Sequence, residues 1–126
     1  GIYMGDQKMV NRAKSKGNSY ENKIYKELRV FLPDLKLTIG SGNSERDADL
    51  VSNKYMFELK HYKTLSDKQL STFFAKVYAE AIEYDKIPIL IFKENYKESK
   101  VMMHVTIEDL TVPCVVSYKH FKEIIK

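Results

Sequence analysis

The chain has 126 residues, 44% of them hydrophobic and 30% charged, which is the size and composition of a single domain with one core. It has no apolar run near the roughly 20 residues that cross a bilayer, and its N-terminus lacks the profile of a secretory signal. We therefore expect a soluble, cytoplasmic protein with no membrane partner. The lone Cys114 excludes an intrachain disulfide, and its apolar neighbours favour a place in the core.

The net charge of +4 comes entirely from the N-terminal part of the chain. Residues 1–36 contain eight Lys or Arg against four Asp or Glu, and the remaining residues contain 13 of each. A polyanion would meet this basic end first, although a solvated tail explains the same charges. We expect residues 1–15 to be a basic, flexible segment and residues 16–126 to be one domain.

The first predicted element is a helix. It opens at Asn18, carries Tyr20, Ile24 and Leu28 at helical spacing, and ends at Pro33.

A capping-box signature from Ser66 to Gln69 opens a second helix of about five turns with one apolar face. Residues 87–92 form a short apolar run that is typical of a strand buried on both faces. The other predicted elements are strands over residues 35–39 and 101–107, a hairpin of two strands around residues 52–53, and a closing helix over residues 117–126. This order predicts an α/β fold in which a mixed central β-sheet is flanked by helices.

Charged residues stand inside one of these strands, in the stretch YMFELK (residues 55–60). Side chains alternate faces along a strand, so Phe57 and Leu59 would pack on the core while Glu58 and Lys60 share the other face. One interpretation is an exposed edge strand whose Glu/Lys pair keeps it soluble. The other interpretation is a functional site whose chemistry uses the charges of Glu58 and Lys60.

The neighbouring strand adds acids to this face. A two-residue turn at residues 52–53 would place Asp47 opposite Glu58 and Asp49 diagonal to it on the same face. Asp47 replaces Asp49 if the register shifts by an even step, and a shift of one residue turns both away. Carboxylates gathered in this way repel one another unless a hard divalent cation neutralises them. With the ammonium of Lys60, they suit metal-assisted hydrolysis of a phosphodiester bond.

Four short motifs occur in order along the chain: Lys16-Gly17 with Glu21 on the first helix, the loop Ser41-Gly42-Asn43-Ser44, Ala48-Asp49, and Glu58-Leu59-Lys60. They resemble the motifs of the PD-(D/E)XK nuclease superfamily, and within it those of the archaeal Holliday junction resolvases and their viral relatives, over about residues 12–110. The chain departs from that pattern where Ser15 replaces Arg, where Ala48 replaces Pro, and in its short interval between Asp49 and Glu58.

The resemblance implies a restriction-endonuclease-like core and a Mg²⁺ cofactor, for which Mn²⁺ can substitute, with no organic cofactor. It implies that Asp49, Glu58 and the Leu59 carbonyl bind the metal. Glu21 would contact the metal directly or through water, and Lys60 would be the catalytic lysine. Glu21 has a second interpretation as a capping residue of the first helix.

The resemblance and the basic N-terminal end together indicate a Mg²⁺-dependent, structure-selective endonuclease of archaeal or viral origin. We expect a Holliday junction resolvase that acts on branched DNA as a homodimer. Two alternatives stay open: a restriction- or repair-type DNA nuclease with the same site, and a non-catalytic nucleic-acid-binding module. Phosphate contacts are expected from Arg12, Lys14, Lys16, Ser41 and Ser44.

Overall fold

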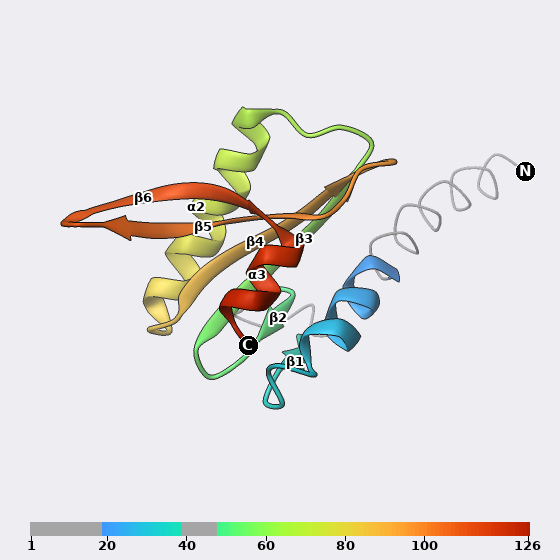
Figure 1. The fold of residues 1–126 in the computed structure, drawn as a ribbon, viewed down its shortest axis with the longest axis horizontal. Coiled ribbons are helices and arrows are strands. Elements are labelled where there is room, and N and C mark those ends of the chain that lie inside the picture. Colours follow the sequence, from blue (N-terminus) through green and yellow to red (C-terminus); the bar gives the residue numbers. More distant parts are fainter. Residues whose placement is uncertain (1–18, 39–47) are drawn as a thin grey trace, which may run out of the picture.

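The computed structural model describes residues 19–38 and 48–126. These residues form a six-stranded sheet in the order β1-β2-β3-β4-β5-β6 (Figure 1), in which β3 and β4 are parallel and the other neighbours are antiparallel. The strands are β1 (Lys36–Leu37), β2 (Leu50–Val51), β3 (Tyr55–Tyr62), β4 (Ile87–Glu94), β5 (Lys100–Ile107) and β6 (Leu110–Ser117). The helices are α2 (Asp67–Glu83), α3 (Tyr118–Ile124) and a helix over residues 19–28, which we call the N-terminal helix. The predicted α/β fold with a mixed, helix-flanked sheet is confirmed.

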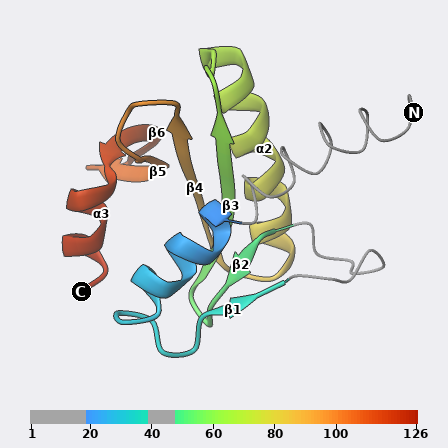
Figure 2. The same ribbon diagram turned by 90° about the vertical axis from the view of Figure 1, so that its right-hand side faces the viewer.

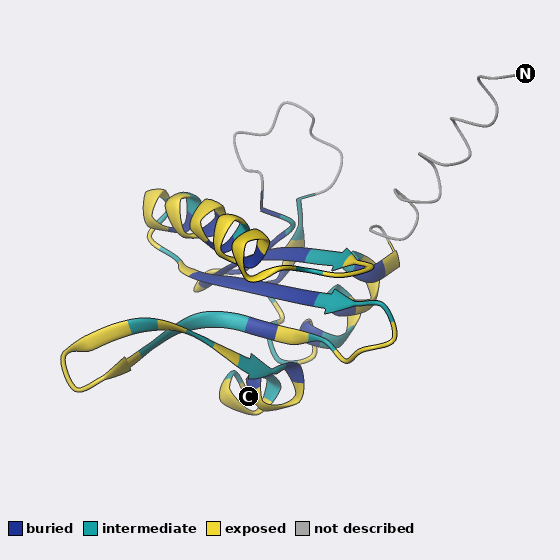
Figure 3. Ribbon diagram, turned by 90° about the horizontal axis from the view of Figure 1, so that it is seen from above, coloured by how far each residue is buried: buried dark blue, intermediate teal, exposed yellow. Residues whose placement is uncertain are grey.

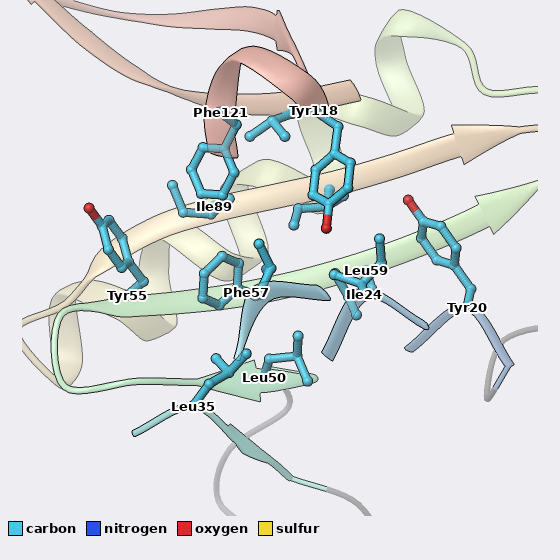
Figure 4. Close-up of a cluster of buried hydrophobic side chains, with 13 residues drawn as sticks. Tyr20, Ile24, Leu35, Leu50, Tyr55, Phe57, Leu59, Ile89, Tyr118 and Phe121 are labelled. Carbon is cyan, nitrogen blue, oxygen red and sulfur yellow. The ribbon is translucent and has the colours of Figure 1, made fainter. Parts of the chain in front are cut away.

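Helices cover both faces of the sheet. The N-terminal helix and α3 lie on one face and α2 lies on the other (Figure 2). Each face has its own cluster of buried side chains, and the first cluster is drawn in Figure 4. The first includes Ile24, Leu28, Phe57, Ile89 and Phe121, and the second includes Met56, Val77, Ala81 and Leu90. None of the helices in the described part of the chain is long and apolar enough to cross a membrane.

Strand β3 lies inside this sheet and is covered on both faces. All residues from Tyr55 to Leu59 are buried, and in Figure 3 the buried residues concentrate on β3 and β4. The interpretation of residues 55–60 as an exposed edge strand is therefore wrong. Glu58 and Lys60 stand in one of the most enclosed strands of the fold.

The predicted helices are confirmed, but the N-terminal helix and α3 (Tyr118–Ile124) both end earlier than predicted. The Ser66 side chain accepts a hydrogen bond from the Gln69 backbone N–H, and the Gln69 side chain accepts one from the Ser66 N–H, which closes the predicted capping box. Helix α3 begins directly after its N-cap, Ser117. The N-terminal helix ends at residue 28, and residues 29–31 form a turn before Pro33.

The sheet has one strand more than the five predicted. Residues 110–117, which we did not assign to a strand, form β6 and pair with β5 along its whole length. Cys114 lies in this edge strand and is half-buried, so its predicted place in the core is wrong. Pro113 stands beside it, and an edge strand tolerates proline because no further strand needs its missing N–H.

The register of the β2–β3 hairpin differs from the prediction by two residues. Val51 pairs with Met56 rather than with Lys54, and three residues, 52–54, lie between the two strands in place of two. The Ser52 hydroxyl holds this turn by accepting from the Tyr55 N–H at 3.0 Å. A shift of two residues keeps every side chain on its predicted face.

Candidate active site

The site forms where β2 begins, beside β3. Glu58 points to the α2 face of the sheet and is only 3% exposed. The Asp49 N–H donates to the Phe57 carbonyl at 2.9 Å, and Asp49 Oδ2 accepts from the Leu59 N–H at 2.7 Å. The paired residues of β2 and β3 end at Leu50, opposite Phe57, and the charge of Asp49 acts on Glu58 from just beyond this pair. The backbone of β3 therefore holds the Asp49 carboxylate beside Glu58.

Lys60 lies against this pair of acids. Its Nζ is 3.2 Å from Glu58 Oε1. The same ammonium lies 4.6 Å from the ring centroid of Phe73 on α2, and the ring of Tyr62 stacks on Phe73 at 5.8 Å. The ion pair and the aromatic ring together restrict the positions open to the ammonium.

The N-terminal helix brings a third acid to the site. The Glu21 carboxyl lies within hydrogen-bonding reach of the Asp49 carboxyl, and its charge acts on both Asp49 and Glu58. The capping interpretation of Glu21 involves Asn18, which lies outside the described residues. The helix thus contributes an acid to the same cluster as the two strands.

Burial makes these acids hard to ionise. Burial is the main cause that raises the pKa of Asp49 to about 7, although the hydrogen bond from the Leu59 N–H lowers it. Burial and then the charge of Asp49 raise the pKa of Glu58 to about 7, while Lys60 lowers it. Burial also raises the pKa of Glu21. For Lys60, burial lowers the pKa but Glu58 outweighs it, so the net shift is upward and the side chain stays an ammonium.

The donor set fits a divalent cation of the hard type. Carboxylate oxygens of Asp49 and Glu58 are ligands that Mg²⁺ prefers. The N–H and C=O of one residue in an antiparallel strand point to the same side, so the Leu59 carbonyl faces the side of β3 on which Asp49 lies. Within residues 19–38 and 48–126, no three His, Cys, Asp or Glu side chains form a ready ion cage. Mg²⁺ does not need one, since it commonly binds one or two carboxylates and keeps several waters.

Several residues predicted from the sequence lie outside the part of the chain that the structure describes. They are Arg12, Lys14, Lys16, Ser41, Ser44 and Asp47. The sequence patterns did not reveal Phe73, because its helical spacing marks it only as a packing residue. They also did not reveal Lys76, whose charge acts on Glu58 from α2. One signal was available in the sequence. The helix that follows the Glu-x-Lys strand carries an aromatic residue and a lysine one turn apart.

The comparisons with known proteins agree with this geometry. Residues 12–122 match the family described as "Phage putative PDDEXK endonuclease", and the chain belongs to this PD-(D/E)XK family. Nucleases of this kind generally depend on a divalent metal ion. The fold is similar to that of Hjc, a Holliday junction resolvase from Archaeoglobus fulgidus, with a TM-score of 0.51 and 14% identity over 87% of this chain and 100% of that one. At this identity the likeness concerns the fold alone. No curated protein matches the sequence.

Without a divalent cation, the free energy of unfolding should fall between about pH 5 and pH 7. The pKa values of Asp49 and Glu58 are raised to about 7 in the folded protein from 3.8 and 4.5. Their stabilising effect is complete below the lower values and is lost as the pH rises through the higher ones. Urea unfolding in EDTA at a series of pH values measures this change. Glu58→Gln should flatten it, and an equal slope in the variant and the wild type would contradict the assignment.

Proposed function

We propose that the protein is a Mg²⁺-dependent DNA endonuclease that hydrolyses phosphodiester bonds at branch points, as a Holliday junction resolvase. The observation that carries the proposal is the gathering of Asp49, Glu58 and Lys60 at the start of β2 beside β3 in a chain of the PD-(D/E)XK family. The similarity of the fold to that of Hjc supports branched DNA as the substrate.

In this proposal Asp49, Glu58 and the Leu59 carbonyl hold the Mg²⁺, which Mn²⁺ can replace, and Glu21 contacts it directly or through water. A divalent cation bound there supplies a Lewis acid for the phosphoryl oxygens and lowers the pKa of water. Lys60 orients the attacking water and stabilises the negative charge that develops on the phosphate. Its contacts with Glu58 and Phe73 support this role, because they hold the ammonium in place before the substrate arrives.

Phosphate contacts are proposed for residues beyond this cluster. Residues 1–15 would be a basic segment that precedes the nuclease domain of residues 16–126. Arg12, Lys14 and Lys16 would bind DNA phosphates together with Ser41 and Ser44. The excess of positive charge in residues 1–36 supports these assignments.

A homodimer is part of the proposal. A four-way junction is close to two-fold symmetric, so two identical sites related by a two-fold axis would match two of its strands. A restriction- or repair-type nuclease would use the same catalytic residues on another DNA. A binding module without catalysis would have no use for buried acids beside Lys60.

Asp49→Asn and Glu58→Gln should each reduce Mg²⁺-dependent cleavage to background, because each removes a charged oxygen ligand. DNA affinity should be kept or increased, since an acid that repels phosphate is lost. Cleavage and binding are measured on one labelled junction. Glu83→Gln, which changes an exposed acid at the end of α2, is the matched control and should leave both unchanged. Cleavage near the wild-type rate in Asp49→Asn or Glu58→Gln would exclude the metal site.

Lys60→Met should lower the cleavage rate by about two to three orders of magnitude, the usual range for a lost electrostatic stabiliser of a transition state. Methionine keeps the packing over Phe73 without the charge, so folding and DNA affinity should change little. Single-turnover kinetics and a thermal melt of the same sample measure the two effects. Full activity, or an unfolded variant, would show that Lys60 has a structural role only.

Substrate choice is tested with a labelled four-way junction, a flap and a linear duplex incubated in parallel with the protein and Mg²⁺. We expect tighter binding to the junction than to the duplex, and paired nicks in strands of like polarity. Sedimentation of the protein alone and on DNA gives the oligomeric state. A strict monomer, or a duplex cut as fast as the junction, would leave a metal-dependent nuclease and refute the resolvase proposal.

A further inference from the structure

A groove of about 520 Å³ lies between the N-terminal helix, the β4–β5 loop and α3. It lies outside the group of Glu21, Asp49, Glu58 and Lys60, which we call the catalytic cluster. Figure 2 shows the two helices side by side on one face of the sheet, with β4 behind them. Five lysines line the groove, from three separate parts of the chain: Lys23, Lys93, Lys97, Lys119 and Lys122. We call it the lysine groove. Two acids, Glu27 and Glu98, share its lining, so its charge is positive and attracts polyanions.

The ammonium groups of Lys97 and Lys122 in the lysine groove make contacts that a ligand can replace or add to. Lys97 Nζ lies 3.6 Å from Glu94 Oε1, but its side chain is 63% exposed, and exposed ion pairs of this kind are weak. Lys122 Nζ lies 4.7 Å from the ring centroid of Tyr118. This contact keeps the charge at the groove while leaving its hydrogen bonds available to a phosphate.

Tyr118 and Glu27 lie together in the groove. Tyr118 is only 9% exposed, and the Glu27 carboxylate lies within hydrogen-bonding reach of its hydroxyl. Figure 4 shows this hydroxyl directed away from α3 and into the space beside the N-terminal helix. Burial, and after it the nearby Glu27 carboxylate, raise the pKa of Tyr118. The hydroxyl therefore stays protonated beside the Glu27 carboxylate, and the lysines supply the positive charge of the groove.

The lysine groove continues towards the catalytic cluster. A smaller cavity of about 210 Å³ shares Lys23 and Lys93 with it and is also lined by Tyr20 and His61. The rings of Tyr20 and His61 are in contact, with centroids 5.3 Å apart. Each of these two residues is next in sequence to a member of the cluster, Glu21 and Lys60 respectively. A chain of phosphates could therefore pass from the cluster, around the end of β3, into the groove.

We propose that the lysine groove binds the phosphodiester backbone of the DNA strand that leaves the active site on the side of the N-terminal helix. The proposal rests on the proposed nuclease function, because it takes the nucleic acid to be already placed at the catalytic cluster. Lysines meet phosphates as point charges and carry no base readout. The groove would therefore add affinity and set the path of one DNA arm without adding sequence preference.

The test uses the full chain with Lys97→Gln and Lys119→Gln combined, since both side chains are exposed at the groove. The matched control combines Lys36→Gln and Lys54→Gln. These two lysines are also exposed, and they lie near the start of β3, at the opposite end of the sheet. Each double variant loses two positive charges. A thermal melt of each confirms folding.

Binding to a fluorescein-labelled junction and to a linear duplex is measured in EDTA, where no cleavage occurs, at several KCl concentrations. The groove variant should weaken binding at all salt concentrations and reduce the slope of log Kd against log [KCl] by about 2, or about one for each phosphate that the variant no longer neutralises. The control variant should change the slope by much less. Equal slopes in the two variants, or a groove variant equal to the wild type, would overturn the proposal.

Cleavage by the wild-type protein in Mg²⁺, measured in parallel, separates this inference from the proposed function. A wild-type protein that cleaves DNA while the groove variant keeps the wild-type slope refutes the lysine groove alone. A wild-type protein that cleaves no DNA while the groove variant loses slope refutes the nuclease function but supports the groove as a phosphate-binding surface.

Discussion

The burial of carboxylates at one point of the sheet is the constraint on which this structure depends. Glu58 is almost fully enclosed in a strand covered on both faces, Asp49 is held beside it by the backbone of β3, and Lys60 contacts Glu58 at 3.2 Å. Charge in such an environment is unfavourable unless opposite charge lies close by. Lys60 balances part of the negative charge. Protons balance the rest in the metal-free protein at low pH, and a divalent cation would balance it in the metal-bound protein that we propose.

The topology places this point at an edge of the sheet. Strands β3 and β4 are parallel and connected through α2, so their carboxyl ends meet at one edge of the sheet, which is where α/β proteins usually bind ligands. Lys60 and His61 come from the end of β3, and Lys93 comes from the end of β4. The N-terminal helix brings Glu21 to the same edge. The proposed catalytic cluster and the lysine groove therefore both lie at the edge where β3 and β4 end.

Local patterns predicted which side chains share a face better than they predicted the pairing of strands. Alternation along β3 placed Glu58 and Lys60 on one face, and the structure has them there in contact. The turn before β3 also contacts a residue far away in the sequence, because the ammonium of Lys86 donates to the Ser52 carbonyl at 2.7 Å. Strand β6 was missed because its hairpin turns at Glu108, which takes a φ of 56° without the Gly or Asn that usually signals such a turn. The lysine groove joins three distant segments, so no window of sequence reveals it.

Calorimetric titration of the metal-free protein with Mg²⁺ near pH 7, repeated in buffers of different ionisation enthalpy, tests the central claim most directly. We expect saturable binding that releases protons, because acids with pKa values of about 7 must lose them to bind a cation. Glu58→Gln should abolish or greatly weaken this binding. The absence of saturable binding in the wild type, or the same affinity and proton release in the variant, would contradict the view that Asp49 and Glu58 form a metal site.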